Sequence, residues 1–163
     1  MTQARAFIGH SFTRDDANIV SIFLKYFDQV SALHPTFTWS HAESAEPLEL
    51  ALKVLAQAET CNVFIGICTI KEGAVKPSDL RRAWMSPTVR KLKDHEIEWK
   101  TSDWVIQEIG LAVGRGMKVI LLLEEGCRRP GGLQGDVEFI QFNRLNPEAT
   151  FGKLLEMIRA VAP

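Results

Sequence analysis

The sequence has few cysteines, no long apolar segment and no excess of either charge. Its three cysteines, Cys61, Cys68 and Cys127, are odd in number and form no C-x-x-C pair, which argues against a disulfide framework and a zinc site and favours a reducing compartment. No apolar run approaches the roughly 20 residues of a membrane-spanning helix. The first residues run directly into a strand-like segment, and not into the apolar core of a signal peptide. We therefore expect a cytoplasmic protein without a membrane partner.

Several motifs that identify an enzyme class are also missing. The chain has no G-x-x-x-x-G-K-[ST] loop, no G-x-G-x-x-G at the start of a helix and no G-x-S-x-G elbow, which argues against nucleoside triphosphatases and serine hydrolases. An aspartyl-phosphate receiver needs carboxylates directly after its first strand. This chain has His10 and Ser11 there.

What the chain does contain is the composition of one ordinary globular domain. Hydrophobic residues make up 46% and charged residues 24% of its 163 residues, enough for one core but hardly for two. The 19 basic and 20 acidic residues leave a net charge of -1, so there is no electrostatic argument for direct nucleic-acid binding. We predict a single domain over residues 1–163.

Short apolar runs alternate with longer segments of helical periodicity, which is typical of a parallel sheet with helices on both faces. We predict five strands, at residues 6–9, 37–39, 63–67, 119–123 and 137–142. The third is apolar throughout and should lie in the middle of the sheet. Four helices are expected to begin near Asp15, Pro47, Ser102 and Phe151, with Ser102 as an N-cap.

Residues 70–100 interrupt this alternation, because a strand-to-helix connection usually needs only about 2 to 6 residues. We interpret the segment as an insertion. Eight basic and five acidic residues give it a net charge of +3, against -4 for the rest of the chain, which favours a contact surface. Short helices are expected near 81–84 and 89–93. The alternative is a solvated excursion whose Trp84 and Trp99 pack on the body.

Open parallel sheets bind ligands at the carboxyl ends of their strands. This rule draws attention to residues 10–16, 39–46 and the helix that begins after Ser102. In that helix Trp104 and Glu108 are four residues apart, so both lie on one helix face.

At these same positions the chain resembles the Toll/interleukin-1 receptor (TIR) family. The opening Phe7-Ile8-Gly9-His10-Ser11-Phe12 is similar to the family's "FISHS" strand, and residues 51–68 are similar to its helix B and strand C. Residues 102–112, with Trp104 and Glu108, resemble its "S-x-W-x-x-x-E-(I/L)-x-x-A" helix. The resemblance implies a flavodoxin-like fold with a five-stranded parallel sheet, into which residues 70–100 are inserted before helix C.

The resemblance also implies an activity, because many TIR domains cleave NAD+ at the nicotinamide–ribose bond. The family's catalytic glutamate corresponds to Glu108, with NAD+ as substrate, no separate cofactor and no metal. A carboxylate suits this reaction because it can stabilise the positive charge that develops on the ribose. The product would be ADP-ribose or a cyclic isomer. The simpler interpretation is that Glu108 is a surface acid.

By position, the resemblance places the loops at residues 10–16 and 40–46 over the nucleotide, although no proline lies inside the second loop and Pro47 directly follows it. The residues that it implies around NAD+ are His10, Ser11, Phe12, Arg14, Trp39, Ser40 and Trp104. Phe12 or Trp39 would stack on a base, and Arg14 would meet a phosphate. Each has a structural alternative: His10 as a satisfied histidine at the buried edge, Phe12 and Trp104 as core residues, and Asp15 and Asp16 as acids that favour a helix N-terminus.

TIR domains commonly act when assembled, so the resemblance implies homo-oligomerisation through TIR–TIR contacts. It also implies a role in prokaryotic immune or antiviral defence or in signalling, with a ligand-sensing domain following this one in a longer protein. Two alternatives remain open: a non-catalytic TIR scaffold for homotypic interactions, and a nucleoside deoxyribosyltransferase-like enzyme with a glutamate nucleophile. Fold does not decide among them.

Overall fold

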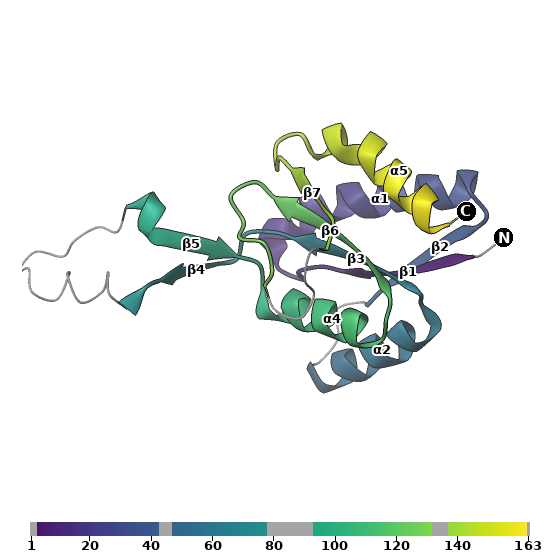
Figure 1. Ribbon diagram of the computed structural model, residues 1–163, viewed down its shortest axis with the longest axis horizontal. Helices are drawn as coiled ribbons and strands as arrows, with labels where there is room; N and C mark the ends of the chain where they lie inside the picture. Colours follow the sequence, from purple (N-terminus) through teal and green to yellow (C-terminus); the bar gives the residue numbers. More distant parts are fainter. Residues whose placement is uncertain (1–2, 43–46, 78–92, 132–136, 163) are drawn as a thin grey trace, which may run out of the picture.

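The computed structural model describes residues 3–42, 47–77, 93–131 and 137–162, and its centre is a five-stranded parallel sheet (Figure 1). The strands are β1 (Ala4–Gly9), β2 (Phe37–His41), β3 (Val63–Cys68), β6 (Lys118–Glu124) and β7 (Phe139–Phe142), in the order β2-β1-β3-β6-β7. This order is flavodoxin-like. The predicted α/β class and the central position of the third strand are confirmed.

Helices cover both faces of this sheet (Figure 1). Helices α1 (Ala17–Leu33) and α5 (Phe151–Val161) lie on one face, and α2 (Pro47–Thr60) and α4 (Asp103–Gly114) lie on the other. Single turns of 3-10 helix, η1 (Arg14–Asp16) and η3 (Pro147–Thr150), precede α1 and α5. No helix in the described part of the chain is both long enough and apolar enough to cross a bilayer.

Side-chain alternation along the strands divides the interior into two cores. In β1, Ala6 and Ile8 pack toward α1 and α5, whereas Phe7 packs toward α2 and α4. Successive side chains of a strand point to opposite faces, and both faces are buried here. This explains why the strands are nearly continuous apolar runs in the sequence.

Local signals placed the helix ends well, and strand ends less well. Ser102 is the N-cap of α4, where its Oγ accepts a hydrogen bond from the backbone N–H of Val105 at 3.4 Å. The helix stops before Gly116, whose φ of 66° suits glycine. By contrast, β1 begins two residues earlier than expected, and β7 begins at Phe139 and not at Val137.

The insertion contains a hairpin that the sequence did not predict. Strands β4 (Glu72–Val75) and β5 (Ile97–Lys100) pair antiparallel and project from the body as an arm (Figure 1). Trp99 lies on this arm with 37% of its surface exposed and belongs to neither core, so the expectation that it packs on the body is corrected. Trp84 and the short helices expected near 81–84 and 89–93 lie outside the described residues.

Candidate active site at the carboxyl edge of the sheet

Glu108 is a buried acid in the middle of α4. Only 5% of its surface is exposed, although charged residues are seldom buried without a partner. The indole N–H of Trp104, one turn earlier, donates a hydrogen bond to its Oε1 at 2.9 Å. Its other oxygen, Oε2, is also buried and has no hydrogen-bond partner. The interpretation of Glu108 as a surface acid is therefore corrected, because α4 turns this face toward the sheet.

The unpartnered oxygen lies against the last residue of β1. A Cβ added to Gly9 would be 2.4 Å from Oε2 of Glu108 and 2.6 Å from the ring of Phe64. Real Cβ contacts of this length do not occur, so a larger residue would displace one of these neighbours. Gly9 therefore lets the carboxyl group reach the carboxyl end of β1, the edge at which such sheets bind ligands.

Burial changes the acidity of Glu108. It raises the pKa of the carboxyl group from 4.5 to about 8, and the hydrogen bond from Trp104 opposes this shift only in part. The nearest titratable neighbour is the thiol of Cys68 on β3, whose own pKa is raised by burial. A carboxyl group with a strongly raised pKa at a ligand-binding edge is a candidate functional group.

A hollow of about 240 Å³ opens beside Glu108, between α2 and α4. Its walls are mainly apolar, and the residues that line it are Val54, Leu55, Trp104, Gln107, Glu108 and Leu111. We call it the α2–α4 hollow. Trp104 is half-buried and forms both a wall of this hollow and the support of Glu108, which combines the two roles weighed for it from the sequence.

His10 lies directly after β1 and makes its hydrogen bonds within the protein. Its Nδ1 is 2.9 Å from the carbonyl oxygen of Ser11, so Nδ1 carries the proton, and its Nε2 accepts from Nδ1 of His41 at 3.0 Å. Burial is the main cause that holds the pKa of His10 below 6.5. The structure therefore places His10 as a neutral, satisfied histidine.

The aromatic candidate Trp39 lies on the opposite face of the sheet from Glu108. Its ring is 6.0 Å from that of Phe27 on α1 and stacks on His41. Phe12 is 37% exposed, and its ring is 4.9 Å from that of His10. The sheet thus separates the sequence-predicted residues into two groups, and only Trp104 accompanies Glu108.

The three remaining candidates are polar and belong to the first two strand ends. Ser11 is buried and uses its hydroxyl on the backbone N–H and the hydroxyl of Thr13. Arg14 is exposed in η1, and Ser40 is half-buried in β2. Residues 43–46, the rest of the second predicted loop, lie outside the described residues.

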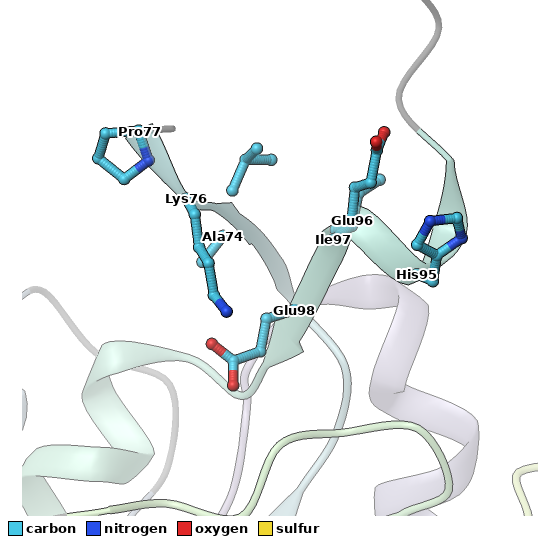
Figure 2. A pocket seen from close by; sticks show the side chains of 8 residues that line it. Ala74, Lys76, Pro77, His95, Glu96, Ile97 and Glu98 are labelled. Carbon is cyan, nitrogen blue, oxygen red and sulfur yellow. The ribbon is translucent and has the colours of Figure 1, made fainter. Parts of the chain in front are cut away.

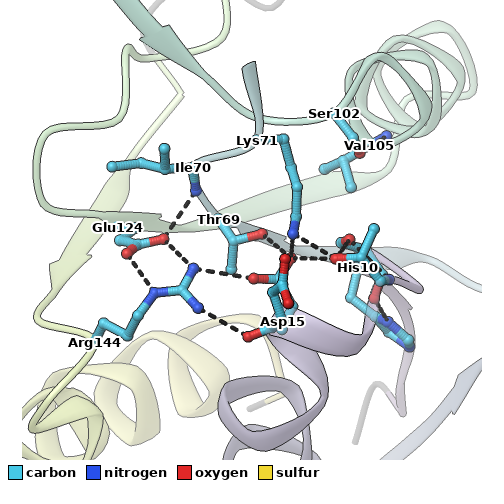
Figure 3. A network of polar contacts seen from close by, with 12 residues as sticks. His10, Asp15, Thr69, Ile70, Lys71, Ser102, Val105, Glu124 and Arg144 are labelled. Carbon is cyan, nitrogen blue, oxygen red and sulfur yellow. Dashed lines mark hydrogen bonds and ion pairs between the residues drawn. The ribbon is translucent and has the colours of Figure 1, made fainter. Parts of the chain in front are cut away.

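A second polar feature, the Asp16 network, joins four segments at the same edge of the sheet (Figure 3). Asp16, fully buried, accepts hydrogen bonds from Thr69 at 2.7 Å and Arg144 at 3.0 Å and forms an ion pair with Lys71 at 2.6 Å. Arg144 also binds Glu124, at the end of β6, through two hydrogen bonds of 2.6 and 2.7 Å. Strands β1, β3, β6 and β7 are thereby connected just beyond their ends.

These partners set the charge of Asp16. Burial alone would raise its pKa, but hydrogen bonds from Lys71, Thr69 and Arg144 outweigh that effect and hold the pKa below 3.8. Asp16 is thus an ionised acid with several donors, whereas Glu108 is an acid with one. The role expected for Asp16 from the sequence, a favourable charge at a helix N-terminus, is corrected, because its carboxylate bonds to other segments.

Sequence reasoning missed Gly9, His41, the apolar walls of the α2–α4 hollow and all partners of Asp16. These residues carry no local signal, since they are far apart in the chain and meet only across strand ends. Glu124 offered one indirect signal, as an acid that ends an apolar strand and so reaches the ligand-binding edge.

A larger hollow, of about 490 Å³, lies on the arm between β4 and β5, where the side chains of Lys76 and Glu98 point toward one another (Figure 2). None of its lining residues comes from the five-stranded sheet or from α4. Within the described ranges, no group of three or more His, Cys, Asp or Glu side chains is arranged to hold a metal ion.

Comparison with known proteins yields structural relatives only. The chain matches no family model and no curated protein. It is similar in structure to the CMP N-glycosidase BcmB of Clostridium botulinum, with a TM-score of 0.52 and 16% identity over 92% of this chain and 97% of that one. It is also similar to a conserved protein of Enterococcus faecalis V583, with a TM-score of 0.52 and 12% identity over 97% and 98% of the two chains. At these identities the likeness shows the fold.

Proposed function

We propose that this protein cleaves the N-glycosidic bond of a nucleotide, and that Glu108 acts at the bond that breaks. One observation carries the proposal: a buried carboxyl group with an unpartnered oxygen lies at the carboxyl end of β1, next to a hollow. Catalytic acids are typically held in such water-poor positions. The similarity in fold to a CMP N-glycosidase supports this class of reaction.

The chemistry accounts for an acid at this position. When the bond between C1′ of the sugar and the base nitrogen breaks, the electron pair leaves with the base and positive charge develops on the sugar. An ionised carboxylate can stabilise that charge, and a neutral carboxylic acid can protonate the departing base. Water then adds to C1′. Both roles require the carboxyl group of Glu108 beside the C1′–N bond.

Three substrates deserve comparison. The TIR resemblance of residues 7–12 and 102–112 favours NAD+, which would give nicotinamide with ADP-ribose or a cyclic isomer. The CMP N-glycosidase neighbour favours a pyrimidine nucleotide. The deoxyribosyltransferase-like alternative favours a deoxynucleoside, with Glu108 as nucleophile. Self-association and a role in immune defence are further parts of the proposal and rest on the TIR resemblance.

The test is to incubate the whole chain with NAD+, CMP or deoxycytidine and to identify the products by mass-resolved chromatography. Each reaction is run at low and at high protein concentration, because self-association is expected to activate the enzyme. We expect one substrate to release its free base, and Glu108→Gln to reduce the rate by about 10²-fold or more.

The matched control is Glu156→Gln, which removes an exposed acid from α5 and should leave the rate unchanged. If wild type releases no base from any substrate at any concentration, the proposal is wrong. The non-catalytic TIR scaffold would then be favoured, and Glu108→Gln should leave homotypic assembly intact.

A further inference from the structure

The surroundings of Glu108 are apolar from every described element that packs against it. Phe64 comes from β3, Val54 and Leu55 come from α2, and Leu111 comes from α4 itself. The titratable group that faces Glu108 is the Cys68 thiol, which burial keeps neutral by raising its pKa. Within the described part of the chain, Glu108 forms no ion pair, and its one hydrogen bond comes from the neutral indole of Trp104.

Asp16 provides an internal comparison at the same edge of the sheet. It is equally buried, but Lys71 and Arg144 supply two positive charges and Thr69 supplies a hydroxyl donor. An ionised carboxylate in an apolar environment needs such partners, because otherwise burial favours the neutral form. The protein thus provides for an ionised acid at Asp16 and does not do so at Glu108.

We propose that Glu108 rests as a neutral carboxylic acid that protonates the departing base, and that the α2–α4 hollow receives this base. This inference rests on the proposed glycosidic cleavage and specifies its substrate class. The substrate is a nucleotide with a neutral base, such as cytosine, which needs a proton to leave. A quaternary pyridinium such as nicotinamide in NAD+ leaves as a neutral molecule without one.

The proton balance of the step is complete without another reactant. As the C1′–N bond breaks, its electron pair moves to the base, and the carboxylic acid of Glu108 transfers its proton to a nitrogen or carbonyl oxygen of that base. Water then forms the new bond to C1′ and gives one proton to the Glu108 carboxylate. The neutral acid is thereby restored.

The α2–α4 hollow fits the base but not a whole nucleotide. Sites for drug-sized ligands enclose roughly 300–1,000 Å³, and this hollow encloses about 240 Å³. Its apolar walls suit the faces of an aromatic ring, and the amide of Gln107 is exposed beside them and can bond the polar edge of a base. The sugar and phosphate would then remain outside, toward the ends of β1 and β3.

The first test compares leaving groups. The probes are CMP and 4-nitrophenyl riboside 5′-phosphate, whose nitrophenolate leaves without a proton. We expect Glu108→Gln to lower kcat/KM for CMP by about 10²–10⁴-fold, the usual contribution of acid catalysis, but for the nitrophenyl compound by less than about tenfold. Wild-type kcat/KM for CMP should fall as pH rises through about 8, where Glu108 ionises.

Equal losses on the two probes, or a rate on CMP that rises with pH, would overturn the inference while leaving glycosidic cleavage intact. Cleavage of NAD+ in preference to CMP would also overturn it. If wild type releases no base from CMP, NAD+ or deoxycytidine, the proposed function itself fails, and this inference with it.

The second test measures the base site without turnover. Free cytosine is titrated into the protein by calorimetry, using Leu55→Trp to fill the hollow and Leu52→Trp as its control. Both leucines are exposed on α2, but only Leu55 lines the hollow, so neither change disturbs the core. We expect Leu55→Trp to weaken cytosine binding by tenfold or more and Leu52→Trp to leave it unchanged. Equal binding by both variants would overturn the assignment of the hollow.

Discussion

At the scale of single residues, the carboxyl group of Glu108 is the feature most out of step with its surroundings. It combines a buried charge-bearing group with one neutral donor and one unpartnered oxygen. A buried polar group without a partner costs about 1–3 kcal/mol of stability. Such costs are typically found at functional positions, and here the cost predicts how the stability of the protein depends on pH.

We expect Glu108 to make the protein less stable as pH rises. Its folded-state pKa of about 8 lies above 4.5, so the folded protein holds more protons than the unfolded chain between these values. The stability linked to Glu108 is complete below 4.5 and is lost as pH rises through 8, with a total on the order of a few kcal/mol. Glu108→Gln cannot titrate and should lose less stability.

Urea unfolding at pH 5, 7 and 9 measures this difference. Glu156→Gln, on the exposed side of α5, should keep the wild-type dependence on pH. If the curves of wild type and Glu108→Gln run parallel from pH 5 to pH 9, the raised pKa of Glu108 is wrong.

Gly9 is the second residue-scale prediction, because its missing side chain makes room for Glu108. A Cβ there would collide with Oε2 of Glu108 and with Phe64, so Gly9→Ala should destabilise the fold by about 1–3 kcal/mol and displace the acid. The control is Gly110→Ala in α4, where a Cβ meets open space. It should raise stability by about 0.5–1 kcal/mol. Thermal unfolding of both variants checks this, and a Gly9→Ala protein as stable as wild type would contradict the close approach.

At the scale of elements, the Asp16 network holds the ends of separate strands together. Lys71 follows β3 and Arg144 follows β7, while Asp16 belongs to η1 after β1. Parallel strands end at one common edge, so a single carboxylate can bind cations from two of them. The network therefore fixes the loop after β1, which also carries Ser11 and Thr13.

Asp16→Asn should leave Lys71 and Arg144 without their shared anion and reduce stability at pH 7 by on the order of 3 kcal/mol. Because the folded-state pKa of Asp16 lies below 3.8, its contribution is present above 3.8 and is lost as pH falls through the lower, folded-state value. The difference between wild type and variant should therefore shrink in strong acid. Urea unfolding at pH 7 and pH 2.5 tests this.

Asp28→Asn, which changes an exposed acid on α1, serves as the matched control and should differ little from wild type at pH 7. A difference between wild type and Asp16→Asn that is the same at both pH values would show that the carboxylate of Asp16 contributes no charge-dependent stability.

At the scale of the whole molecule, the body and the arm are separate in their packing. Neither core contains a described residue from 72–100. The arm joins the body through backbone bonds, from Lys71 N–H to the Lys100 carbonyl at 2.9 Å and from Arg128 N–H to the Trp99 carbonyl at 2.6 Å. The body should therefore fold without the arm.

Glu72 and Lys100 face each other across the hairpin, so residues 73–99 can be replaced by Asn-Gly, a favoured two-residue turn. We expect this shortened chain to unfold cooperatively, with a Tm within a few degrees of wild type, because the lost ion pair between Arg128 and Glu98 is exposed and contributes little. Circular dichroism and size-exclusion chromatography measure the outcome. A broad transition or aggregation would show that the insertion completes the core.

The order of the elements and the identity of Glu108 were determined by the sequence alone. Apolar periodicity reports secondary structure because each residue's burial follows from its position in a helix or strand, and the N-cap Ser102 marks the start of α4 locally. Trp104 and Glu108 share a face for the same reason, since four residues make about one helical turn. These are short-range facts, and the chain needs no knowledge of its distant parts to express them.

Only the tertiary structure decided what surrounds that acid. The contact of Gly9 with Glu108, the binding of Asp16 by Lys71 and Arg144, and the separation of Trp39 from Glu108 by the sheet all join residues distant in sequence. The register of neighbouring strands sets such contacts, and one residue of register moves a side chain to the other face. No local pattern contains this information, so the sequence identified the acid, and its burial and protonation emerged from the fold.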